Sequence, residues 1–158
     1  MGILFSLLKQ FRYRTIQPTP EPVYHKCIFT PKGHKKALII GINYQDNACS
    51  DDDLNGCADD TKRLKSYLTN CCFFKEEEIT VLCNPYETTK NSIHIQLREL
   101  VFYSYTHLYS EIWFSFSGHG GGVYNTDEDD QQSEFICPSD YNKHGVIHDE
   151  WLKNHFIN

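Results

Sequence analysis

The chain has 158 residues, of which 40% are hydrophobic and 14% aromatic, which fits one compact domain plus a tail and excludes a wholly disordered chain. The net charge of −6 is unevenly spread: residues 1–36 hold seven Lys or Arg and one acid, whereas the rest holds eight basic and twenty acidic side chains. An acidic body repels phosphates, which argues against nucleic acid and favours cations or basic peptide side chains as partners.

Residues 1–35 are predicted to form a basic, proline-containing tail and linker. Apolar residues recur at helical spacing within residues 1–14, and Pro18, Pro20 and Pro22 then favour extended structure. The first six residues fit the pattern Met-Gly-x-x-x-Ser, so Gly2 is a candidate for N-myristoylation, with basic residues behind it as a second membrane signal. A plain tail without lipid is the alternative interpretation.

The seven cysteines have no regular spacing, and no secretory signal is evident. No stretch is long and apolar enough to span a membrane. We therefore expect mostly free thiols in a reducing, cytoplasmic compartment, with any membrane contact made through residues 1–14.

The folded domain is predicted for residues 36–158. A continuous apolar run at 37–42 is typical of a strand buried on both faces. A helix is expected near 54–69, capped by Asp53, followed by a strand at 78–82. Thr89 is expected to cap a helix near 90–105, whose inner face would comprise Ile93, Leu97, Leu100 and Val101.

A third strand is predicted at 111–117, and it runs directly into Gly118, His119 and three glycines. Alternating strands and helices with short connections predict a three-layer α/β fold with a mainly parallel sheet and right-handed crossovers. Catalytic groups in such sheets gather at the carboxyl ends of the strands, where His119 is expected.

His119 is the strongest candidate for a catalytic residue. A histidine can serve as a general acid and base near neutral pH, and the glycines after it, from Gly120 onward, could offer backbone N–H groups to an oxyanion. The alternative is a histidine in a mobile glycine turn.

Four ordered matches carry a resemblance to a known family. The first is residues 36–44 (KALIIGINY), and the second is residues 54–60 (LNGCADD). The third is residues 115–121 (SFSGHGG), and the fourth comprises residues 136–141 (ICPSDY) and 145–150 (GVIHDE). Together they resemble the metacaspases, a family of caspase-like cysteine peptidases, at the opening strand, the start of the first helix, the catalytic-histidine segment and the segments that follow it. The resemblance implies a caspase-like sandwich of the larger-subunit (p20) type.

In that family the histidine works with a cysteine in an Asp-x-Cys-His-Ser-Gly-type segment, which the chain does not contain. We expect the sequence to stop before the nucleophile, which leaves the fold incomplete at its C-terminus, and a separate C-terminal subunit is one source of the missing part. Cys137 does not match the nucleophile position, and Cys57 is a remote substitute because a nucleophile needs its base within hydrogen-bond reach.

Asp60 matches the aspartate that lines the primary specificity pocket of metacaspases, which cleave after Arg or Lys. A carboxylate pairs well with such a side chain. The alternative is an ordinary acidic residue in the first turn of a helix, favoured by the helix dipole.

Many metacaspases are activated by calcium, and the resemblance implies that Asp149 and Glu150 form part of a calcium site. The family's other expected aspartate falls on Ser133, beside Glu134, so the ligand set is partial. No cofactor is expected for the chemistry itself. The acidic residues 127–130 can equally be read as a solvated loop.

Two functions follow from the resemblance: a cysteine endopeptidase region that is inactive as this chain alone, or a non-catalytic module that binds peptides. An α/β-hydrolase, suggested by His119 and the glycines, is a distant third because no Gly-x-Ser-x-Gly elbow is present. A nucleotide-binding fold is also weak, because no phosphate-binding loop follows Gly41.

Overall fold

The computed structural model describes residues 33–45, 53–124 and 132–156. Its main sheet has three parallel strands in the order β2-β1-β3. The central strand β1 (Lys35–Gly41) pairs with β2 (Ile79–Leu82) on one side and with β3 (Glu111–Ser117) on the other. The three predicted strands and their parallel arrangement are confirmed.

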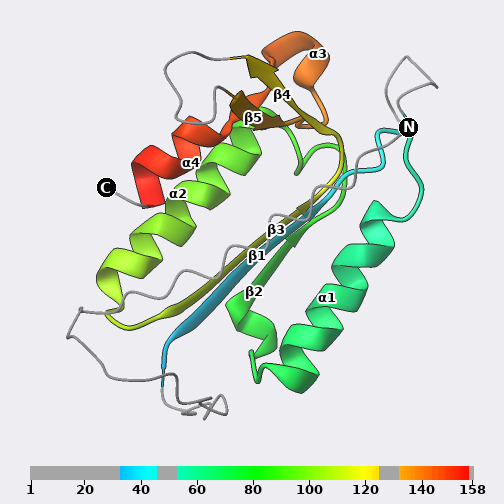
Figure 1. The fold of residues 1–158 in the computed structure, drawn as a ribbon. Helices are drawn as coiled ribbons and strands as arrows, with labels where there is room; N and C mark the ends of the chain where they lie inside the picture. The colour runs from blue at the N-terminus through cyan, green and yellow to red at the C-terminus, as the bar shows by residue number, and fades with distance from the viewer. Residues whose placement is uncertain (1–32, 46–52, 125–131, 157–158) are drawn as a thin grey trace, which may run out of the picture.

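Helices cover both faces of this sheet (Figure 1). One face carries α1 (Cys57–Cys71), and the other carries α2 (Lys90–Thr106) and α4 (Asp149–Phe156). The alternation of side chains along β1 supplies both cores: Ala37 and Ile39 pack with Leu68 of α1, whereas Leu38 and Ile40 pack with residues of α2. The predicted three-layer α/β fold, consistent with a caspase-like fold, is therefore confirmed.

A second, smaller sheet was not predicted. Strands β4 (Gly120–Tyr124), β5 (Gln132–Ile136) and β6 (Ile147–His148) pair antiparallel in that order. The short helix α3 (Tyr141–His144) lies between β5 and β6, and a short 3₁₀ helix, η2 (Glu76–Glu78), precedes β2. The alternative interpretation, a mobile glycine turn, is wrong for Gly120–Gly122, which begin the first strand of this sheet.

The two long helices begin differently. The Thr89 side chain accepts a hydrogen bond from the Ser92 N–H, so the predicted cap of α2 is confirmed, and Ile93, Leu97 and Leu100 are buried while Val101 is half-buried. The predicted Asp53 cap of α1 is wrong. The N-cap is Gly56, with φ at +107°, and the Ala58 N–H donates to Asn43 Oδ1 instead.

Among the described residues no helix has the length and apolar character needed to cross a membrane. The five cysteines within the described ranges are free thiols, as expected: Cys57, Cys71, Cys72, Cys83 and Cys137. Gly2 and the rest of the basic tail up to residue 32 lie outside the described residues, as does the acidic stretch at 127–130.

Candidate active site

The ends of β1 and β3 lie side by side at the carboxyl edge of the main sheet. Gly41 is the register partner of Ser117, and one residue further the Ile42 N–H donates to the Ser117 carbonyl at 2.9 Å. His119 follows two residues after β3 ends and is half-buried. The structure thus places His119 at the predicted edge, while its catalytic role stays a prediction.

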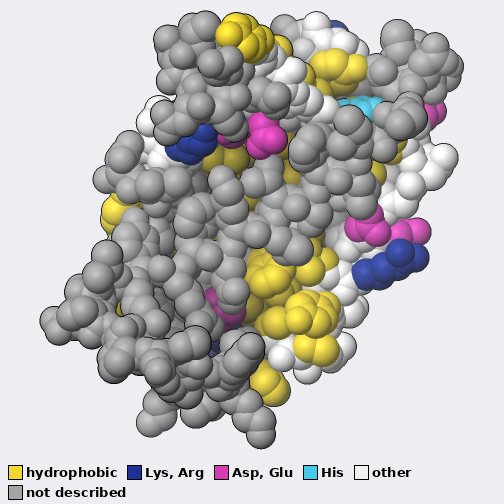
Figure 2. Space-filling view, viewed as in Figure 1, with side chains coloured by type: hydrophobic (Ala, Val, Ile, Leu, Met, Phe, Trp, Pro, Cys, Tyr) yellow, Lys and Arg dark blue, Asp and Glu magenta, His cyan; other side chains and the backbone are white. Residues whose placement is uncertain are grey.

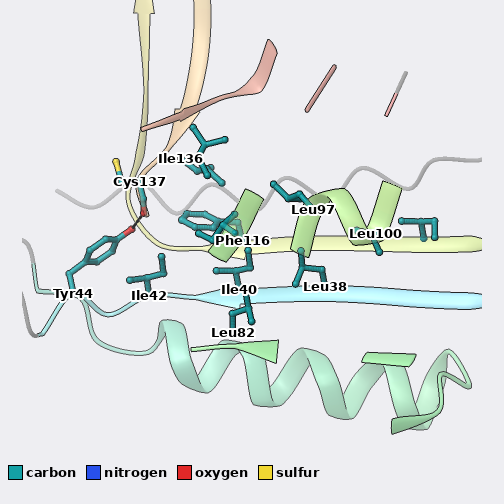
Figure 3. Close-up of a cluster of buried hydrophobic side chains, with 13 residues drawn as sticks. Leu38, Ile40, Ile42, Tyr44, Leu82, Leu97, Leu100, Phe116, Ile136 and Cys137 are labelled. Carbon is teal, nitrogen blue, oxygen red and sulfur yellow. Dashed lines mark hydrogen bonds between the residues drawn. The ribbon is translucent and has the colours of Figure 1, made fainter. Parts of the chain in front are cut away.

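Tyr44 holds the main chain around His119. Its hydroxyl accepts a hydrogen bond from the His119 N–H at 3.0 Å and donates one to the Cys137 carbonyl at 2.6 Å. Figure 3 shows the second of these bonds, with Tyr44 reaching across from the end of β1. We call this arrangement the Tyr44 bridge. The two ring centroids of Tyr44 and His119 are 4.6 Å apart, so the contact extends to the imidazole.

The Tyr44 phenol is buried, and burial raises its pKa well above the ordinary value of 10.0, although the hydrogen bond from the His119 backbone partly lowers it. The hydroxyl therefore stays protonated and can donate and accept at once. Gly118 makes room for it, because a Cβ at that position would lie 2.8 Å from the Tyr44 oxygen.

The glycines after His119 belong to β4. Gly120 is opposite Ile136 and Gly121 is opposite Phe135 in the ladder with β5. A Cβ at Gly121 would lie 2.8 Å from Cζ of the Phe135 ring, so packing explains that glycine. The expected contribution of the Gly120 N–H to an oxyanion site stays a prediction.

Asp60 lies in the first turn of α1 and reaches the same edge of the sheet. The Ser117 hydroxyl donates to Asp60 Oδ2 at 3.3 Å, and Arg63 Nη1 is 3.7 Å from Oδ1. Acidic and basic side chains lie next to each other over this part of α1 in the space-filling view (Figure 2). The Asp60 side chain is 43% exposed, which leaves it accessible to a basic ligand.

Cys137 and Cys57, the two cysteines considered as nucleophiles, are both buried. The Cys137 N–H donates to the His119 carbonyl at 3.0 Å, and Cys57 is the first residue of α1, packed beneath Gly41. A thiol nucleophile must reach a peptide carbonyl, which requires access that neither buried side chain has.

The expected calcium ligands Asp149 and Glu150 are the first two residues of α4. Asp149 Oδ1 is buried without a hydrogen-bond partner among the described residues, as a cation ligand would be, while Oδ2 lies 3.0 Å from Lys153 Nζ. Glu150 is exposed, and the Ser133 hydroxyl contacts His148 Nδ1 at 3.2 Å. Within the described ranges no group of three or more His, Cys, Asp or Glu is placed to hold a metal ion. The buried Asp149 oxygen fits such an ion, and the expected partial calcium site of Asp149 and Glu150 stays a prediction.

Sequence reasoning missed the Tyr44 bridge. Tyr44 appeared only as the last residue of a motif, and its partners His119 and Cys137 lie 75 and 93 residues away in the chain. The one usable signal was Gly118 before His119, because a glycine beside a buried strand end often marks close approach of another group.

Comparison with known proteins gives a consistent result. The family described as "Metacaspase, peptidase C14 domain" matches residues 35–158. Metacaspase-1A of Neurospora crassa is 35% identical over 136 residues, which cover 82% of this chain and 28% of that protein. Metacaspase-1 of Plasmodium falciparum is also 35% identical, over 82% of this chain and 22% of that protein.

Metacaspase-3 of Arabidopsis thaliana is 32% identical over 144 residues, or 87% of this chain and 36% of that protein. The chain thus spans between 22% and 36% of the length of these three relatives. The matched family region contains the whole main sheet and both Asp60 and His119. The chain belongs to the metacaspase family of cysteine peptidases, through its peptidase C14 domain.

Proposed function

We propose that this chain is the histidine-bearing part of a cysteine endopeptidase that cleaves after Arg or Lys, and that it does not cleave peptides by itself. The observation that carries the proposal is the meeting of Asp60 and the β3 end. Asp60 is hydrogen-bonded to Ser117, only two residues before His119, and this proximity supports the roles of side-chain anchor for Asp60 and proton acceptor for His119.

In the proposed reaction His119 accepts the proton of a cysteine thiol supplied by the segment that this chain does not contain. The thiolate attacks the peptide carbonyl carbon and forms a C–S bond, and the imidazolium then donates its proton to the departing amine. Water, deprotonated by His119, cleaves the resulting thioester and regenerates the thiol. The Gly120 N–H is the candidate donor to the oxyanion of both tetrahedral intermediates.

Asp60 would select the residue before the scissile bond. Its half-exposed carboxylate can pair with the guanidinium or ammonium group of a bound peptide, which replaces the weak contact to Arg63. The pairing would anchor the peptide next to His119 without taking part in bond cleavage.

The test is a fluorogenic peptide with Arg or Lys before the scissile bond. The purified 158-residue chain should show no turnover, and adding an Asp-x-Cys-His-Ser-Gly-containing C-terminal segment from a related metacaspase, in cis or in trans, should restore it. His119→Ala should abolish the restored activity, whereas His144→Ala, which alters an exposed histidine, should not. Thiol-dependent cleavage by the chain alone would overturn the proposal and make Cys57 the first residue to mutate.

The Asp60→Asn variant distinguishes a role in substrate binding from a role in bond cleavage. It should raise KM for Arg and Lys peptides while the alkylation rate of the nucleophilic cysteine stays unchanged, because the Cys–His pair remains intact. An unchanged KM would show that Asp60 does not bind the basic side chain of the substrate.

We also propose that calcium, as an activator, binds at Asp149 together with groups outside the described residues. Asp149→Asn should weaken calcium binding by the active form in isothermal titration, while Glu87→Gln, at an exposed site, should not. Equal affinity in the wild type and Asp149→Asn would dismiss Asp149 as a ligand.

A further inference from the structure

His119 is fixed through its main chain by two neighbours from different parts of the chain. Its carbonyl accepts from the Cys137 N–H at 3.0 Å, and its N–H donates to the Tyr44 hydroxyl at 3.0 Å. The register of β4 and β5 puts His119 opposite Cys137, because Gly120 is opposite Ile136. Two residues so placed in an antiparallel ladder would ordinarily exchange both hydrogen bonds.

Here one of those two bonds passes through Tyr44. The phenol hydroxyl is inserted between the His119 N–H and the Cys137 carbonyl, and satisfies both. A hydroxyl is suited to this place because it donates and accepts with one atom, and burial keeps it protonated. The insertion also ties the small sheet to the end of β1 in the main sheet (Figure 3).

The backbone indicates that this arrangement is maintained against a conformational cost. Tyr44 has φ of +59°, in the left-handed region that is unfavourable for a bulky residue. Such conformations persist where surrounding contacts determine them, and they concentrate at functional sites. The surrounding contacts are the two hydrogen bonds, the His119 ring, and the Tyr141 ring, whose centroid is 6.1 Å from that of Tyr44.

We propose that Tyr44 is a positioning residue for His119, and that its hydroxyl sets the separation between His119 and Cys137 and thereby the place of the imidazole. This inference rests on the proposed role of His119 as the base. Without the hydroxyl the strands either close to a direct hydrogen bond, which moves the imidazole, or leave two buried polar groups unsatisfied, which removes the restraint on the His119 main chain. Tyr44 is 3% exposed, which leaves its side chain little surface for contact with a bound peptide, so substrate binding should change little.

The first test uses the active, cysteine-containing form of the protein. Tyr44→Phe keeps the ring and removes the hydroxyl, and it should lower kcat by about 10²-fold with KM nearly unchanged, as expected for a displaced catalytic group. Tyr103→Phe, a half-buried tyrosine of α2, is the matched control and should leave both constants unchanged.

The second test needs no catalysis. In the 158-residue chain, hydrogen exchange of the His119 amide should accelerate about tenfold or more in Tyr44→Phe, relative to the Ile40 amide in the same variant. Gly118→Ala, which pushes a methyl group against the Tyr44 oxygen, should have the same effect and carries the test if Tyr44→Phe does not fold.

The outcomes separate the two proposals. Wild-type kcat in Tyr44→Phe, together with complete loss in His119→Ala, overturns the positioning role and leaves the proposed function standing. Activity that survives His119→Ala overturns the proposed function itself. A fall in kcat with unchanged His119 amide exchange also overturns the positioning role, because the loss would then not arise at the bridge.

Discussion

The two ends of β1 are held in place by different chemistry. At the amino end Lys35 is 6% exposed, and its ammonium lies 3.2 Å from Glu111 and 4.9 Å from the centre of the Phe74 ring, with a further bond to the Cys72 carbonyl. Just beyond the carboxyl end Tyr44 is 3% exposed and makes neutral hydrogen bonds to His119 and Cys137. One end is held by a buried charge and the other by a buried hydroxyl.

The difference follows from what each end must do. A buried ion pair is costly to break, because a single charge left behind is poorly solvated, and this makes it a strong but purely structural fixture. A neutral hydroxyl fixes geometry without placing a charge beside the histidine. An added charge there would shift the balance of the imidazole between its protonated and neutral forms. We therefore expect the buried polar side chains that support the proposed base to be uncharged.

The largest effect should come from breaking the charged end. Lys35→Ala leaves Glu111, which is 27% exposed, facing the core without its partner, and should lower the free energy of unfolding by about 3 kcal/mol. Urea unfolding followed by circular dichroism measures it. Lys36→Ala, at the half-buried neighbour, is the control and should cost less than about 0.5 kcal/mol. Similar losses in both variants would mean that the ion pair adds little.

At the carboxyl end the strongest steric test is Gly41→Ala. The new Cβ would overlap the Cys57 carbonyl and lie 2.5 Å from Thr61 Cγ2, so α1 must move away from the sheet, at a cost of about 2 kcal/mol. Thermal unfolding should show it. Among the described residues, a Cβ at Gly33 would meet only the Tyr109 carbonyl, at 3.7 Å, so Gly33→Ala should not destabilise the fold. An equal loss of stability in Gly33→Ala would contradict the steric explanation for Gly41→Ala.

The Tyr44→Phe variant tests the neutral end of β1 through the pH dependence of the free energy of unfolding. At neutral pH the lost hydrogen bonds should cost about 1–2 kcal/mol. The folded-state pKa of Tyr44 is raised above the unfolded value near 10.0, so its contribution to stability is complete below that value and declines as the pH rises above it.

The wild type should therefore lose up to about 1.4 kcal/mol of stability per pH unit above about pH 10 from this residue alone. Tyr44→Phe should have a shallower slope over that interval. Denaturant titrations at a series of alkaline pH values give the difference between the two slopes. Parallel slopes would indicate that the phenol ionises as readily in the folded chain as in the unfolded one.

The smallest effect is expected at Asp60, which shares the edge with Tyr44 but is exposed. Asp60→Asn should change the free energy of unfolding by less than about 0.5 kcal/mol, since exposed ion pairs such as that with Arg63 contribute little. A larger loss in chemical denaturation would assign Asp60 a structural role in holding α1 to Ser117.

Much of the main sheet could be predicted because its signals are local. The strand β3 was predicted at 111–117 and is found at Glu111–Ser117, since an apolar run bounded by polar residues allows few alternatives. The start of α2 was equally clear, because Thr89 caps it with its own side chain. His119 could be placed at the carboxyl edge from the alternation of strands and helices.

The rest depends on contacts between distant residues. Gly120–Gly122 form a strand only because Ile136, Phe135 and Glu134 pair with them. Glycine has a low β-propensity, so the sequence of this segment does not by itself predict a strand. The N-cap of α1 is Gly56 and not the predicted Asp53. The acceptor for the Ala58 N–H comes from Asn43, in the loop after β1, which the local sequence of the helix does not reveal. The left-handed conformation of Tyr44 has no signature in its own residue type.

The register of β1 also has a consequence for synthesis on the ribosome. Lys35 pairs with Glu111, and every other β1–β3 partner is likewise 76 residues further along the chain. At about 5–20 residues per second, the central strand waits roughly 4–15 seconds for its second neighbour to be made. During that interval a run of aliphatic side chains destined for burial on both faces is exposed beside one short partner at most. The nascent chain is therefore expected to be most open to non-native contacts of this strand until β3 has been made.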